Sequence, residues 1–139
     1  MERDQIQAQK YAVSLVKKID GHYHCLKTAV KDFQEKCLRV SPGRSVPPDI
    51  INQIRESYKG IRDRLVETKS IQQLLQTKYR QFYHRDPIRD KEIIEFEFLS
   101  KNSYSKFEFT LKEIEAKKKM ERERLAQMAH KNEPPRGSF

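Results

Sequence analysis

The sequence predicts an all-α fold, a long antiparallel helical hairpin of coiled-coil type over residues 4–84 followed by a third, mostly helical segment over residues 86–130. Two long stretches place apolar residues at alternating spacings of three and four, and a short break rich in proline separates them. Charged residues make up 35% of the chain and hydrophobic residues 36%, which is typical of a surface-rich helical protein. With 139 residues, the chain is expected to form one domain over residues 1–130, with a flexible tail at 131–139.

The first helix is predicted from the apolar pattern between residues 9 and 40. A three-four alternation over more than four heptads is typical of a coiled-coil seam, because 3.5 residues per turn keep one stripe turned toward a partner. The sequence Ser41-Pro42-Gly43 is expected to end this helix. Its predicted seam residues are Val16, Ile19, Tyr23, Leu26, Val30 and Phe33.

The second helix is predicted from the same alternation over residues 51–82. Pro47-Pro48 followed by Asp49 suits a helix start, since proline is tolerated in the first turn and an acid there favours the helix dipole. Asp86-Pro87 is expected to break the run. The predicted seam residues of this helix are Ile51, Ile54, Tyr58, Ile61 and Leu65.

The two stripes fit each other when the chain folds back at residues 41–48. Positions whose numbers sum to 87 or 88 then face each other without a slip in register, so that Leu26 meets Ile61. An eight-residue connection suits antiparallel neighbours, and we therefore favour a hairpin within one chain over pairing between two chains. Thr68 and Gln72 interrupt the second stripe, which we interpret as a loosened seam near the open end; control of register is the alternative.

The third segment carries conflicting patterns. Asp86-Pro87 is a good N-cap followed by a proline in the first turn, and the surroundings are helical. In residues 95–98 and 106–109, however, phenylalanine alternates with charged residues at a spacing of two, which is the pattern of a short β-hairpin near 92–110. We favour the helix.

A further apolar set lies beside the seam and, by the same pairing, gathers at the open end of the hairpin. The third segment holds the densest aromatic cluster of the chain. We expect this cluster to cover the open end, and binding of a partner in a groove is the alternative. The candidate partner contacts are Val13, Leu15, Ile71, Leu74, Phe96, Phe98, Phe107 and Phe109.

The net charge is +9, from 29 basic and 20 acidic residues, and the excess is spread along the chain. The strongest basic run is interrupted by glutamates, which favours a solvated helix with internal ion pairs over a nucleic-acid contact. The candidate polyanion contacts in this run are Lys117, Lys118, Lys119, Arg122 and Arg124.

The sequence contains no pattern that predicts catalysis, a cofactor or a metal site. His22 and His24 are two residues apart, so on a helix they point about 200° apart and cannot share an ion. A glycine-rich phosphate loop is missing from a chain with 4 glycines at distant positions. We therefore expect a protein that is not an enzyme.

These features predict a non-enzymatic helical interaction protein that is a structural or adaptor subunit of a larger assembly, cytoskeletal or otherwise. Its expected partners are other, helical protein subunits. Because no run approaches 18 apolar residues, insertion into a membrane is not expected. Two cysteines are too few for a disulfide framework, which favours an intracellular, cytoplasmic location, with the cytoskeleton or the nucleus as alternatives. The alternative function is a basic accessory factor that binds nucleic acid or another polyanion.

Overall fold

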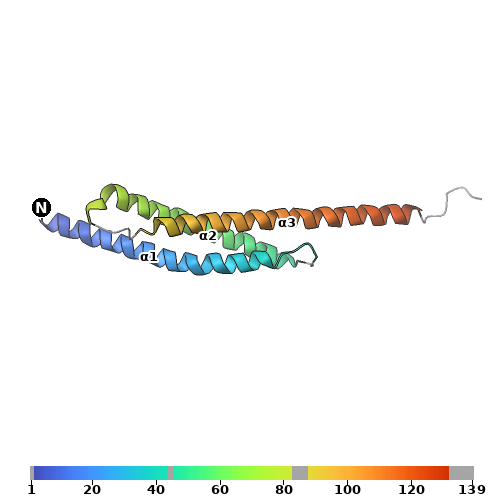
Figure 1. The fold of residues 1–139 in the computed structure, drawn as a ribbon, viewed down its shortest axis with the longest axis horizontal. Coiled ribbons are helices and arrows are strands. Elements are labelled where there is room, and N and C mark those ends of the chain that lie inside the picture. Colours follow the sequence, from blue (N-terminus) through green and yellow to red (C-terminus); the bar gives the residue numbers. More distant parts are fainter. Residues whose placement is uncertain (1, 44–45, 83–87, 132–139) are drawn as a thin grey trace, which may run out of the picture.

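Long helices form an elongated bundle in the computed structural model of the chain (Figure 1). The structure describes residues 2–43, 46–82 and 88–131. The regular elements in these ranges are α1 (Glu2–Leu38), α2 (Pro48–Lys78), the short 3-10 helix η1 (Arg80–Phe82) and α3 (Asp90–Lys131). With 37 and 42 residues, α1 and α3 are about 55 Å and about 63 Å long at ~1.5 Å per residue.

The predicted hairpin is confirmed, because α1 and α2 pack closely against each other as antiparallel arms of one chain (Figure 1). Contacts between the two helices report the register. The aromatic rings of Phe33 and Tyr58 lie 5.7 Å apart, and those of Tyr11 and Tyr79 lie 5.4 Å apart. The residue numbers of these two pairs sum to 91 and 90, so the register agrees with the predicted sum of 87 or 88 to within one helical turn.

The predicted seam lies in the interior. Four of its residues, Val16, Tyr23, Ile51 and Tyr58, are partly exposed. The others are buried, and they are Ile19, Leu26, Val30, Phe33, Ile54, Ile61 and Leu65. The hydrophobic effect along this stripe is therefore the main force that holds the two arms together.

The N-terminus of α2 agrees with the sequence prediction, whereas its C-terminus does not. Pro47 is the N-cap and a proline occupies the first turn, as predicted. The helix ends at Lys78, earlier than the stripe suggested, and Tyr79 leads into η1. The predicted cap at Asp86-Pro87 and most of the predicted tail, residues 132–139, lie outside the described residues.

The third segment is one continuous helix from Asp90, so the β-hairpin near residues 92–110 does not form. Its position differs from our expectation. Phe107, Leu111 and Ile114 pack with Val40, beside the turn of the hairpin, rather than at the open end. The third segment contributes Ile88 to the cluster of buried residues at the open end.

Contacts of Ile88 and Arg89, the two residues just before α3, fix where this helix begins on the hairpin. Nε of Arg89 donates a hydrogen bond to Oδ1 of Asp20 at 2.9 Å, and Nη2 forms an ion pair with the same oxygen at 2.7 Å. The guanidinium lies 3.8 Å from the centre of the Tyr23 ring. Nε2 of Gln72 donates to the backbone oxygen of Ile88 at 2.6 Å. The chain is thus held near the middle of the hairpin just before α3 begins, and α3 covers the half that leads to the turn.

The interpretation of the polar seam positions as a loosened seam is therefore wrong. Gln72 is 5% exposed and Thr68 is 0% exposed. The Thr68 hydroxyl donates to the backbone oxygen of Arg64 at 2.7 Å, and Gln72 makes the bond to the start of the third segment. Both are satisfied buried polar groups, which is why the core accepts them.

Candidate interaction surfaces

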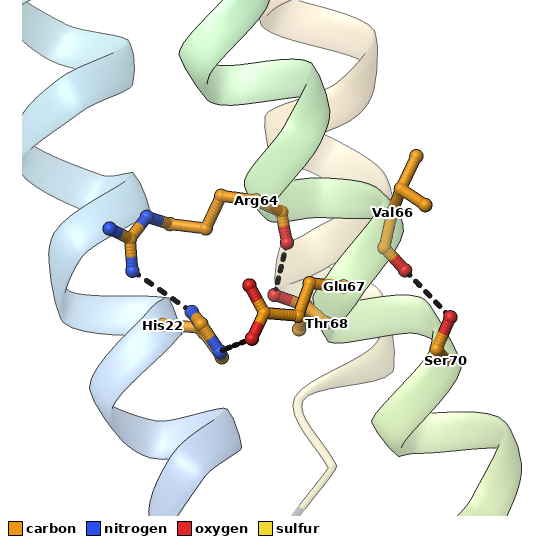
Figure 2. Close-up of polar contacts among 6 residues, drawn as sticks. All are labelled: His22, Arg64, Val66, Glu67, Thr68 and Ser70. Carbon is orange, nitrogen blue, oxygen red and sulfur yellow. Dashed lines mark hydrogen bonds and ion pairs between the residues drawn. The ribbon is translucent and has the colours of Figure 1, made fainter.

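Polar side chains tie the middle of α1 to α2 (Figure 2). Nη1 of Arg64 donates to Nδ1 of His22 at 2.9 Å, which requires the imidazole tautomer with its hydrogen on Nε2. That nitrogen lies 3.7 Å from Oε1 of Glu67. Figure 2 also shows the Ser70 hydroxyl bonded to the backbone oxygen of Val66. Each of these contacts joins groups of the hairpin to one another, so we assign them a structural role.

An aromatic cluster joins the three long helices of the described chain. The rings of Tyr58 and Tyr104 are parallel to within 4° with centres 4.0 Å apart, and the Phe33 ring lies 6.5 Å from that of Tyr104. Burial raises the pKa of the Tyr104 phenol, the nearby carboxylate of Glu108 raises it further, and Arg55 opposes both. The phenol therefore stays neutral at physiological pH and serves packing.

A groove of about 560 Å³ runs between α1 and α3 beside the turn. Cys37 and Phe107 form part of its wall, and Leu38, which is 82% exposed, also lines it. Burial raises the pKa of the Cys37 thiol to about 11. Because the thiolate is the nucleophile and the metal ligand, this cysteine is poorly suited to either role at neutral pH.

The phenylalanines of the third segment divide between two faces of α3. Phe107 is 2% exposed, and Phe96 is partly buried with its ring stacked 5.7 Å from that of Tyr23. Phe98 and Phe109 are 66% and 65% exposed. Residues two apart on a helix point about 200° apart, so the alternation that resembled a strand places one phenylalanine of each pair toward the hairpin and the other toward solvent.

The candidates at the open end are mostly used within the chain. Leu15 is buried, and Ile71 and Leu74 are partly buried against the same cluster. Val13 is 47% exposed. Of this set, Val13 therefore presents the most of its side chain to solvent.

Sequence reasoning missed two members of the exposed face of α3. Ile94 is 56% exposed and Met120 is 69% exposed. With Phe98 and Phe109 they follow each other at spacings of four, eleven and eleven residues. Since eleven residues nearly complete three turns, the four side chains share one side of the helix within an arc of about 80°. We call these four residues the outer stripe. The repeated spacing of eleven residues is the sequence signal that could have identified Ile94 and Met120 as members of it.

The last part of α3 extends beyond the turn of the hairpin (Figure 1). Residues 115–129, which we call the overhang, are all exposed. Leu125 and Met128 follow the buried Leu111 and Ile114 by fourteen residues each, a whole number of heptads, so they continue the face that packs on the hairpin. Leu125 is 59% exposed and Met128 is 50% exposed.

The candidate polyanion contacts also lie on the overhang, and all five are exposed. At about 100° per residue they point to several sides of the helix rather than along one stripe, with Glu115, Glu121 and Glu123 among them. The structure thus exposes these side chains without bringing them onto a single face.

No family model, curated protein or solved structure matches the chain. Within the ranges that the structure describes, no group of three or more His, Cys, Asp or Glu side chains is placed to hold a metal ion. None of the described helices is both long and apolar enough to cross a membrane. Functional inference therefore rests on the exposed surfaces of the helices.

Proposed function

We propose that the chain is a non-enzymatic helical interaction protein that serves as a structural or adaptor subunit of a larger protein assembly. The observation that carries this proposal is the overhang. Its apolar residues Leu125 and Met128 lie on the same side of α3 as the buried residues of the preceding turns, which pack against the hairpin. Past the turn the hairpin no longer covers this face (Figure 1).

The overhang supports a particular kind of partner. Around the face that contains Leu125 and Met128, basic side chains outnumber acidic ones: Lys117, Lys118, Arg122 and Arg124 against Glu115 and Glu121. An amphipathic helix with an apolar stripe and acidic flanks is complementary to this face of the overhang. Its apolar stripe can pack on the face as the hairpin packs on the earlier turns of α3, and its acidic flanks can pair with the basic side chains. We propose a helix of this type, from another protein, as the partner. We also propose an intracellular location, in the cytoplasm, with the cytoskeleton or the nucleus as alternatives, because two cysteines are too few for a disulfide framework.

The test is a pull-down of the tagged full-length chain from nuclease-treated native extract at low and moderate salt, read by mass spectrometry. We expect a protein set at fixed stoichiometry that survives both conditions with the unchanged chain. The double substitution Leu125→Asp and Met128→Asp should remove it, whereas Ala126→Asp combined with Gln127→Asp, an equal charge change at two exposed residues of the same segment, should not. Retention of the same set by the double variant would refute the role of the overhang.

A second candidate is a basic accessory factor that binds nucleic acid or another polyanion, and it is supported by the exposed basic run on the overhang. Binding of that kind depends steeply on salt, because it releases counterions. Retention of the chain on heparin or DNA at near-physiological salt, together with loss of all captured proteins after nuclease treatment, would favour this candidate over the protein assembly.

A further inference from the structure

The outer stripe leaves a long apolar line on the side of α3 that faces away from the hairpin. It runs from Ile94 to Met120, a distance of about 39 Å at ~1.5 Å per residue. The buried residues of the same helix, such as Phe107 and Leu111, lie on the other side. Because α3 has two apolar faces and the hairpin covers one, the second face is available for a further helix.

The exposed area is large for one side of a single helix. A large apolar side chain buries on the order of 150–250 Å². At exposed fractions between 56% and 69%, the four residues of the outer stripe together present about 500 Å². Two such stripes placed face to face would cover about 1,000 Å², which is the minimum for a biological interface and is sufficient only where the two surfaces are complementary.

We infer that the outer stripe pairs with the outer stripe of a second copy of this chain, in antiparallel orientation. This inference deepens the proposed function and rests on it in one respect, namely that the chain works through contacts between helices. It assigns to this face a partner different from the helix proposed for the overhang.

The argument for a second copy comes from the sizes of the residues along the stripe. Two small residues, Ser105 and Ala116, lie on the same side of the helix as the four large ones. When two copies are aligned with paired positions that sum to 214, Phe98 faces Ala116 and Phe109 faces Ser105. Each phenylalanine then meets a small residue, which is the alternation that interdigitated packing requires.

The same alignment places the remaining members of the stripe against each other, because Ile94 faces Met120. The sequence of large and small residues along the stripe is therefore self-complementary about a twofold axis at the level of residue 107. An isologous dimer requires such self-complementarity. In the register that instead sets Phe98 against Phe109, Ile94 faces Glu113 and the stripe loses its end contacts. The complementary register also covers Met120, which the hairpin of its own chain does not reach.

Charge and shape permit this approach. On and beside the outer stripe the exposed charged residues are nearly balanced in sign, and they are Lys91, Lys101, Lys112, Lys119, Glu95, Glu113 and Glu123. The net charge of +9 is therefore not concentrated where the copies would meet. Since each hairpin packs on the opposite side of its α3, the two hairpins would lie on the outside of a central helix pair.

The test measures the mass of the full-length chain in solution by sedimentation equilibrium over about a hundredfold range of concentration that brackets the low micromolar. We expect a monomer–dimer equilibrium. Phe98→Ser combined with Phe109→Ser should weaken the dimer at least about tenfold and leave the helical circular dichroism unchanged, because both side chains are exposed. Leu38→Ser, at an exposed apolar residue outside the stripe, is the matched control and should leave the dimer intact.

The register has its own test. Ser105→Phe enlarges the apolar stripe, so it would strengthen an unspecific association, but in the proposed register it sets two phenylalanines against each other and should weaken the dimer. A chain that stays monomeric over the whole range overturns the inference, as does a dimer that Ser105→Phe strengthens. Neither result affects the pull-down with the overhang variants, so failure of the self-pairing is distinguishable from failure of the proposed function.

Discussion

Replacement of Arg89 tests whether contacts at the start of α3 fix the position of that helix. The side chain makes a hydrogen bond and an ion pair with Asp20 and lies over the Tyr23 ring, and the side chains of Arg89 and Asp20 are 30% and 48% exposed. At this exposure the ion pair contributes about 0.5–1 kcal/mol and the cation–π contact about as much. Arg89→Ala should therefore lower the free energy of unfolding by about 1–2 kcal/mol.

The backbone of Arg89 makes the prediction sharper. Its φ angle is 50°, in the left-handed region where a residue with a Cβ is disfavoured by roughly 1–2 kcal/mol. Arg89→Gly loses the same contacts as Arg89→Ala but relieves this strain, so it should be about 1 kcal/mol more stable than the alanine variant. The order of stability is thus expected to be arginine, then glycine, then alanine.

The assay is urea unfolding of each variant, followed by far-ultraviolet circular dichroism. Arg62→Ala is the matched control, because this exposed arginine lies 5.8 Å from the centre of the Tyr58 ring, at the edge of cation–π range. It should change the free energy of unfolding by less than about 0.5 kcal/mol. If Arg89→Ala unfolds like the unchanged protein, or if the glycine variant is the least stable, our account of how α3 is positioned is wrong.

Three further changes test other parts of the fold. Leu26→Asp buries a charge at a fully buried seam position and should destabilise the chain by at least about 3 kcal/mol, seen as loss of helical signal on heating; an unchanged melt would contradict the hairpin core. Gln72→Leu removes the donor to the backbone before α3 and should cost about 1 kcal/mol in urea unfolding; no loss would mean that this bond does not anchor the segment. Because burial raises the pKa of Cys37 to about 11, alkylation measured by peptide mass spectrometry should be slower at Cys37 than at the exposed Cys25, and its rate should rise about tenfold per pH unit up to that pKa; equal rates at pH 8 would contradict the burial.

The raised pKa of Cys37 also sets the sign of a pH effect on stability. The folded chain binds the thiol proton more tightly than the unfolded chain, whose cysteine keeps the ordinary value of 9.0. The stabilisation is present below about pH 9 and is lost as the pH rises toward about 11. Cys37→Ser should remove this part of the alkaline destabilisation, which urea unfolding at pH 8 and pH 10 measures.

The hairpin was predictable because its information is local and periodic. A three-four alternation fixes which side of each helix is apolar, and a break of eight residues fixes the direction in which the arms return, so the packed sides of the two arms, and their register to within one turn, follow from counting. The place of α3 along the hairpin was not predictable in this way. It depends on the individual contacts of Arg89 with Asp20 and of Gln72 with Ile88, which join residues far apart in the sequence and have no period.

The surfaces were predictable only in part. The sequence singled out Phe98 and Phe109 as partner contacts, and both are exposed, but it grouped them with Phe96 and Phe107, which the hairpin covers wholly or in part. Composition alone cannot separate these pairs, because all four are phenylalanines next to charged residues. The separation requires knowing that the segment is a helix, after which a spacing of two residues places them on opposite sides.

The alternation of phenylalanine and charged residues with period two therefore indicates, on a helix, an apolar residue on each of two opposite faces. A helix at the edge of a bundle needs one apolar face, whereas a helix with an apolar face on each side is typical of the interior of a larger bundle. In α3 the face that includes Phe107 is filled by the hairpin, and the face that includes Phe98 and Phe109 is not filled within the described chain. Substituting the buried member of a pair should destabilise the monomer, while substituting the exposed member should affect only association. A comparison of Phe107→Ser with Phe109→Ser by thermal melting and by sedimentation separates these effects, and a Phe109→Ser chain that melts as early as the Phe107→Ser chain would refute the view that α3 has two distinct working faces.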